Sequence, residues 1–132
     1  MGGMRNMINI QKQIEYWRHG SEEDWAVAQE LVDRGRVRHG LFFAHLALEK
    51  ALKAHVCAKT QDLAPRIHNL LDLAERAGAP LTPQRRKTLA RLNAFCLAGR
   101  YPEALPPVPS ATQARALMKQ SKEVLTWLIE TL

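Results

Sequence analysis

Cysteines and long apolar runs are scarce in this chain. Its two cysteines, Cys57 and Cys96, stand alone among 132 residues without a CxxC or Cys/His spacing, which argues against a zinc site and against a secreted disulfide framework. No run approaches the roughly 20 apolar residues of a membrane span, and the first residues lack the apolar core of a signal peptide. We therefore expect one soluble, cytoplasmic domain over residues 1–132, with reduced thiols and no membrane contact.

Sequence motifs for catalysis and cofactor binding are also missing. The chain has no Gly-rich phosphate loop, and Glu49 has no second carboxylate at helical spacing with which to form a catalytic pair. We expect no cofactor and no bound metal. The formal charge of +6 favours anionic partners such as nucleotides or RNA, although many basic proteins of this size bind neither.

Helical periodicity dominates the first half of the chain. Apolar residues from Ile10 to about Gly35 recur at steps of three and four, the spacing of one buried helical face. Acidic residues follow Gly20 and Ser21 and suit a first helical turn, so this helix either restarts there or runs on. Residues 39–58 are apolar on most sides, as expected for a central helix.

Capping residues mark the helices of the second half. Asn69 caps a short helix that ends at Ala77, before Gly78 and Pro80. Thr82 supplies a capping oxygen to a fourth helix, and the proline that follows it suits a position whose N–H has no helical partner. We expect this fourth helix to run to about Cys96.

A Pro-rich connector over residues 102–109 excludes both a helix and a central strand there. After it, Ser110 and Gln113 form a capping box, and the last helix runs to the C-terminus. No segment shows strand alternation. The pattern predicts an all-α fold, an antiparallel up-and-down bundle of four long helices plus one short helix. We expect the three tryptophans in its core: Trp17, Trp25 and Trp127.

One row of charged residues crosses the otherwise apolar central helix. His45, Glu49 and Lys53 are spaced i, i+4 and i+8 and therefore share one side. The simpler interpretation is a helical ion pair worth about 0.2–0.5 kcal/mol if exposed. Alternatively, water is partly excluded there, and a bound nucleotide meets Lys53 with its phosphate and Glu49 with its ribose or base.

Two further groups of residues are candidates for binding anions. Arg100 and Tyr101, followed by Pro102, either bind a phosphate and stack on a base or pin the connector to the bundle. The expected fourth helix has a basic face that is either a solvated surface or a contact for RNA or a partner. That face consists of Arg85, Arg86, Lys87 and Arg91. His68, just before Asn69, is expected to close the loop against the helix start.

Four short motifs resemble one known family. Residues 43–54, FAHLALEKALKA, are similar to the A-x-E-K-A-x-K-A stretch of the HEPN domain family. Trp17 with Glu23, Asp24 and Ala28 resembles the family's opening helix. Residues 67–70, IHNL, resemble its H-[DN]-L entry to the third helix, and residues 100–102 match its recurrent RYP. The four motifs occur in the family's order and span nearly the whole chain.

The resemblance implies an antiparallel helical bundle, often a homodimer, that is commonly encoded beside a small MNT-type nucleotidyltransferase in prokaryotic toxin–antitoxin or defence modules. It also implies binding of a nucleotide or RNA. The interpretation that we favour is such a binding protein rather than an enzyme. In it the nucleotide site consists of His45, Glu49, Lys53, Arg100 and Tyr101. A homodimer also agrees with the apolar side chains that so small a bundle leaves exposed.

Many HEPN proteins are metal-independent ribonucleases that use an arginine followed four to six residues later by a histidine, late in the bundle. Residues 92–109 contain no histidine, so that pair is not carried over to this chain. Arg34 with His39 and Arg38 with His45 meet a similar spacing elsewhere, as chance alone would give for this composition. A metal-independent endoribonuclease toxin, and a pure helical scaffold without a ligand, remain alternative interpretations.

Overall fold

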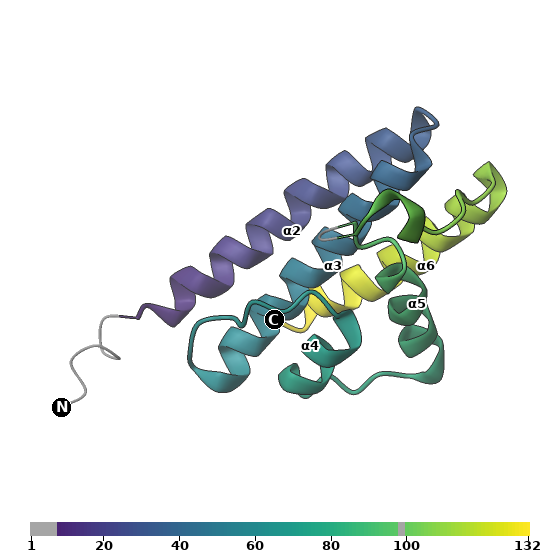
Figure 1. Cartoon of the computed structure of the whole chain (residues 1–132). Helices are drawn as coiled ribbons and strands as arrows, with labels where there is room; N and C mark the ends of the chain where they lie inside the picture. The colour runs from purple at the N-terminus through teal and green to yellow at the C-terminus, as the bar shows by residue number, and fades with distance from the viewer. Residues whose placement is uncertain (1–7, 98–99) are drawn as a thin grey trace.

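The computed structural model describes residues 8–97 and 100–132, and within these ranges the chain is all-helical, without a strand (Figure 1). The described residues form five α-helices and one short 3-10 turn, η1. Their bounds are α2 Ile10–Asp33, α3 Val37–Thr60, α4 Leu70–Ala77, α5 Pro83–Asn93, η1 Pro102–Ala104 and α6 Ala111–Glu130. No described helix has both the length and the apolar character needed to cross a membrane.

The two longest helices, α2 and α3, form a tight hairpin. Helix α2 does not restart at Gly20 and Ser21 but runs through them without a break. Ser21 is buried, and its hydroxyl donates to the main-chain oxygen of Ala47 at 2.8 Å. Asp24 lies one turn further along and pairs with Lys50 at 2.8 Å. These small and acidic residues therefore mark the contact with α3 rather than a helix start.

Helix α3 lies at the centre of the bundle and packs against each of the other four α-helices. Its buried apolar residues include Leu41, Leu48 and Leu52, all with no exposed surface. It runs two residues beyond the expected range at each end. The sequence prediction of a central helix is confirmed, because only a helix surrounded by others buries apolar residues on most of its sides.

The last helix runs in the same direction as α3, which corrects the predicted up-and-down order. Near the start of α3, Arg38 donates to the main-chain oxygen of Pro106, just before α6. Near its end, the His55 ring lies 2.7 Å from the main-chain oxygen of Leu128 on α6. The segment between α3 and α6 therefore carries the chain back from the end of α3 to its beginning, as Figure 1 shows.

The predicted caps are present, but some element lengths differ. Asn69, Thr82 and Ser110 each accept hydrogen bonds from the first turn of α4, α5 and α6, and the capping box is complete. Helix α5 ends at Asn93, so it has only 11 residues and is not a fourth long helix. The connector was predicted to exclude a helix, but it contains the short 3-10 turn η1. Pro102 is its first residue, where the N–H that proline lacks would have no helical partner in any case.

The tryptophans are half-buried and lie at the edge of the core, which corrects their predicted place inside it. Each of two rings carries a cation on its face. Lys53 Nζ lies 5.2 Å from the ring centre of Trp17, and the Arg85 guanidinium lies 4.1 Å from that of Trp127. Such a ring buries an apolar edge and offers its face to a cation, which explains why these rings remain at the boundary.

We expect Gly40→Ala to destabilise the protein strongly. A Cβ at Gly40 would lie 2.4 Å from Val32 Cγ2 and 3.0 Å from the main-chain nitrogen of Val32. Overpacking of this kind costs about 1–3 kcal/mol. Urea denaturation measures the loss. The matched control is Gly20→Ala, where the nearest atom, at 3.1 Å, belongs to the flexible side chain of Lys50. Equal stabilities of the two variants would contradict this account of the hairpin.

Candidate functional site

The charged row of α3 lies in the interior of the protein. Lys53 Nζ donates to Glu49 Oε2 at 3.0 Å, and His45 Nδ1 lies 3.7 Å from Glu49 Oε1. The side chains of His45, Glu49 and Lys53 are 0%, 5% and 7% exposed. The Glu49–Lys53 pair is buried, so removing either partner would leave the other as a buried charge without a counter-ion. The cost in stability would be larger than for a surface ion pair.

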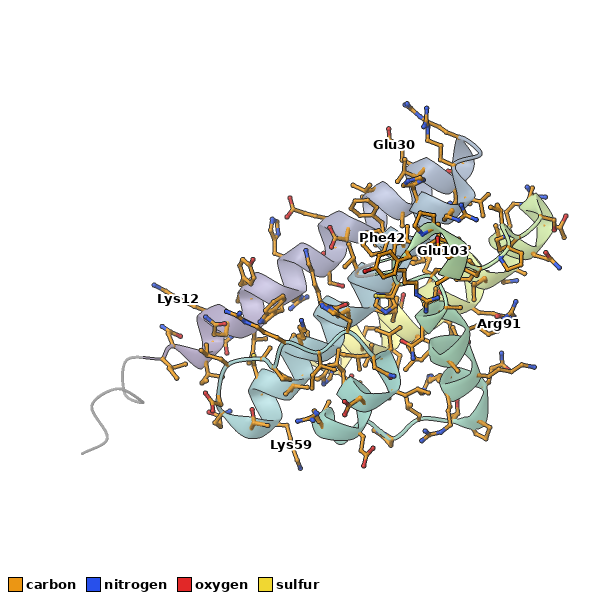
Figure 2. All side chains as sticks on the ribbon, in the orientation of Figure 1. Lys12, Glu30, Phe42, Lys59, Arg91 and Glu103 are labelled. Atoms are coloured by element: carbon orange, nitrogen blue, oxygen red, sulfur yellow. The ribbon has the colours of Figure 1, made fainter. Side chains whose placement is uncertain are left out.

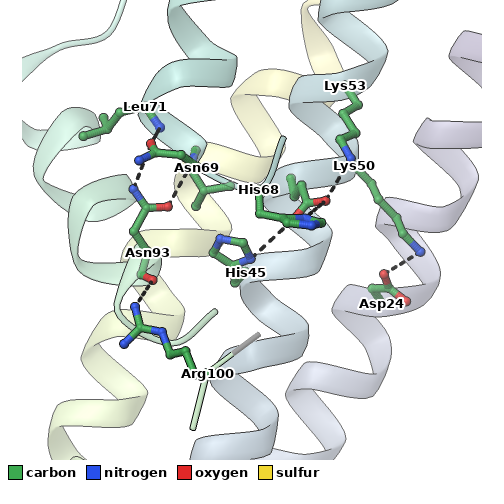
Figure 3. Close-up of polar contacts among 11 residues, drawn as sticks. Asp24, His45, Lys50, Lys53, His68, Asn69, Leu71, Asn93 and Arg100 are labelled. Atoms are coloured by element: carbon green, nitrogen blue, oxygen red, sulfur yellow. Dashed lines mark hydrogen bonds and ion pairs between the residues drawn. The ribbon is translucent and has the colours of Figure 1, made fainter. Parts of the chain in front are cut away.

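A fourth residue, His68, closes the row from outside. Its Nδ1 lies 3.1 Å and 3.2 Å from the two carboxylate oxygens of Glu49, and its side chain is 57% exposed. Figure 3 shows His68 beside His45, with the two residues reaching the same carboxylate from different segments. His68 was expected to close the loop against the start of α4; its side chain instead contacts Glu49 on α3 and connects this buried carboxylate to the surface. Glu49 is therefore held by Lys53 and His68 together.

His45 is the least satisfied member of this group. Neither ring nitrogen has a hydrogen-bond partner among the described residues, although the Asn93 side chain and the main chain of His68 approach the ring. Burial lowers the pKa of His45 below its usual value, and the nearby Glu49 carboxylate offsets only part of that effect. The ring is thus a neutral, buried group with unused hydrogen-bonding capacity.

A pocket of about 300 Å³ opens next to this row. It forms where the loop before α4, the end of α5 and the start of the connector meet. Its lining residues are His68, Asn69, Asn93, Cys96 and Arg100. Of the predicted nucleotide site, only Arg100 lines the pocket, while the row of α3 lies beside it and Tyr101 is 74% exposed next to Arg100. The pocket therefore contains the Arg100 cation, and its wall residue His68 contacts the buried Glu49.

Arg100 keeps its charge uncompensated. Its Nη1 donates to the main-chain oxygen of Ala104 at 3.2 Å, and its Nη2 donates to that of Asn93 at 3.4 Å. No carboxylate among the described residues lies within ion-pair distance of it. Arg100 is thus bonded to the connector and to the end of α5, while its predicted contact with a phosphate stays a prediction.

Asn93 is the residue of this region that the sequence does not reveal. Its side-chain oxygen accepts from Leu70 N at 2.9 Å, and its side-chain nitrogen donates to Asn69 Oδ1 at 3.2 Å. The spacing between Asn69 and Asn93 is 24 residues, so no local pattern connects them. Only the return of α5 alongside α4 brings the two asparagines together.

The basic residues of α5 have different surroundings. Arg85 makes a bidentate pair with Glu123, with atoms 3.2 Å and 2.9 Å apart, and it also covers Trp127. Arg86 lines a different pocket, beside α4. Lys87 and Arg91 are exposed, one turn apart, and Figure 2 shows Arg91 pointing away from the bundle. Arg85 thus has a structural role, whereas Arg86, Lys87 and Arg91 are exposed, and their contact with RNA or a partner stays a prediction.

Of the two arginine–histidine pairs, Arg34 with His39 matches the ribonuclease spacing and Arg38 with His45 exceeds it by one residue, and the structure does not bring either pair together in a shared site. Arg34 pairs with Glu30 at 3.1 Å, and His39 is exposed. Arg38 donates to Pro106 and is separated from His45 by about two helical turns. No group of three or more histidine, cysteine or acidic side chains in the described ranges has the geometry of a metal site.

The comparisons with known proteins agree with the fold. The family model described as HEPN domain matches residues 14–132, and the chain therefore belongs to the HEPN domain family. Among solved structures, it is similar to the crystal structure of TT1696 from Thermus thermophilus, with a TM-score of 0.76 and 21% identity. The alignment covers 91% of this chain and 98% of that one. No curated protein matches the chain.

We expect His45 to make the stability of the protein depend on pH. Its folded pKa lies below the usual 6.5, so below that pH the unfolded chain binds more protons and stability falls. His45 contributes a slope of at most about 1.4 kcal/mol per pH unit to the free energy of unfolding plotted against pH. Urea denaturation at about pH 7, 6 and 5 measures it across this window. His45→Gln should flatten the profile, whereas His19→Gln, at an exposed position, should not. Parallel profiles for the wild type and His45→Gln would contradict the buried, neutral state.

Proposed function

We propose that this HEPN protein binds the phosphate groups of a nucleotide or RNA at the pocket of His68, Asn93 and Arg100. One observation carries the proposal. Arg100 holds its charge at the pocket wall with main-chain oxygens as its hydrogen-bond partners. A cation fixed in place without a counter-ion is what an anionic ligand requires.

The neighbouring residues support a division of roles. Arg100 and the exposed edge of His68 contact the phosphate, and the exposed ring of Tyr101 is free to stack on a base. Glu49 and Lys53 are paired with one another inside the protein, so they support His68 instead of meeting the ligand directly. His45 lies beneath the pocket and has ring nitrogens available to the network.

We also propose that the protein acts as a homodimer with a small MNT-type nucleotidyltransferase in a prokaryotic toxin–antitoxin or defence module. Membership of the HEPN family supports this partnership, and exposed apolar side chains such as Tyr16, Leu63 and Val108 are compatible with contacts between chains. Within the described residues 92–97 and 100–109 there is no histidine for the family's cleaving pair, which favours binding over ribonuclease activity.

We expect Arg100→Ala to weaken ATP binding by about tenfold or more, because a charge-assisted hydrogen bond contributes about 1.5–3 kcal/mol. Isothermal titration calorimetry measures the affinity. Arg91→Ala is the matched control, since it removes an exposed arginine of α5 outside the pocket. The wild-type affinity should also fall with added salt, as expected for phosphate contacts. Absence of nucleotide and RNA binding by the wild type, or equal losses in both variants, would reject this site.

Light scattering tests the assembly. We expect a particle of twice the chain mass of 14.9 kDa at micromolar concentration, because the family's bundles pair through exposed apolar faces. Co-expression with the nucleotidyltransferase of a neighbouring gene, where one exists, should yield a complex that survives size-exclusion chromatography. A monomer under these conditions would refute the dimer, and separate elution of the two proteins would refute the partnership.

A further inference from the structure

Asn93 occupies an unusual position in the pocket. It is the last residue of α5, and its side chain leaves its own helix to bond with the start of α4. Its main-chain oxygen is one of the helix-terminal acceptors that have no partner within a helix, and it accepts from Cys96 N at 3.3 Å and from the Arg100 guanidinium at 3.4 Å. Figure 3 shows Asn93 between Asn69 and Arg100. One residue thus connects α4, α5 and the connector.

We infer that Asn93 is the positioning residue of the proposed phosphate pocket, because its carboxamide fixes the main chain to which Arg100 is hydrogen-bonded. This inference rests on the proposed function. The carboxamide has two fixed partners, Leu70 N at 2.9 Å and Asn69 Oδ1 at 3.2 Å. These bonds hold the end of α5 against the first turn of α4, and thereby set the place of the Asn93 carbonyl.

The alternative anchor for Arg100 is weak on its own. The second hydrogen bond of the guanidinium, to Ala104, joins Arg100 only to the connector that follows it, four residues along the chain. A contact of this kind shapes the connector but does not fix it to the bundle. The main chain of Arg100 is held by its N–H, which donates to Leu97 O at 3.2 Å. The bond to Asn93 is the one that ties the guanidinium itself to α5 and so orients its charge toward the pocket.

Asn93 and Asn69 together remove the start of α4 as a competing anion site. The amides of its first turn are already used, since Leu70 N donates to Asn93 and both Leu71 N and Asp72 N donate to Asn69 Oδ1. The N-terminus of α4 therefore offers no free donor of this set to a phosphate. The recognition of an anion is left to Arg100 and His68, whose relative position depends on Asn93.

A variant pair separates this role from ordinary stabilisation. Asn93→Ala removes both side-chain bonds and leaves the main-chain acceptor in the sequence. Thr82→Ala is the control, since it removes the cap of the same helix, a bond of 3.2 Å to Arg85 N, at the end far from the pocket. We expect both variants to lose some stability, because each removes a capping interaction.

Calorimetry with ATP gives the first readout. Asn93→Ala should weaken binding by about tenfold, the loss of roughly one well-placed charge contact, while Thr82→Ala should retain the wild-type affinity. Nuclear magnetic resonance of the Arg100 guanidinium gives a second readout that needs no ligand. Its N–H protons should exchange with water faster in Asn93→Ala than in the wild type and in Thr82→Ala.

The two readouts separate the two proposals. If the wild type binds no ATP, inorganic phosphate or RNA, the proposed function fails, and the exchange rate of the Arg100 protons still decides whether Asn93 positions them. If Asn93→Ala matches Thr82→Ala in the exchange of those protons, the positioning role is wrong. Wild-type affinity in Asn93→Ala, where the wild type does bind, would also overturn it.

Discussion

The buried carboxylate of Glu49 is the constraint around which the site is arranged. A carboxylate at 5% exposure is tolerated in a protein interior only when cations and hydrogen-bond donors surround it. Lys53 supplies the charge from the next turn of the same helix, and its ammonium lies over the ring of Trp17 on α2. His68 supplies the remaining contact and therefore ties the loop after α3 to the middle of that helix.

Arg85 and Arg100 differ in whether their charge is matched by a carboxylate within the protein. Arg85 is matched by a bidentate carboxylate and by an aromatic face, so its guanidinium is fully engaged within the bundle. Arg100 has only carbonyl oxygens as partners among the described residues, and these orient the guanidinium without cancelling its charge. The sequence places Arg85 on a basic helical face and Arg100 in the RYP motif, and only the structure shows that the first has a carboxylate partner and the second has none among the described residues.

The sequence predicted the elements well because local chemistry determines where helices begin. Asn69, Thr82 and Ser110 cap helices through residues no more than three positions away. It also predicted the row on α3, since a helical period places His45, Glu49 and Lys53 together regardless of tertiary structure. The pocket was only partly predicted. Asn93 meets Leu70 across 23 residues, and a contact of that kind depends on how α4 and α5 return along α3.

The shared direction of α3 and α6 has a consequence for how the chain folds. The turn between α2 and α3 spans only Arg34, Gly35 and Arg36, so this hairpin closes a minimal loop. Docking of α6 beside α3 must instead close a loop that contains α4, α5 and the connector, and the entropy lost in loop closure grows with loop length. The hairpin is therefore the natural nucleus, and α6 is the element added at the greatest entropic cost. The pocket of His68, Asn93 and Arg100 is lined entirely by residues of the enclosed segment, so it is part of the chain that this long loop must bring back.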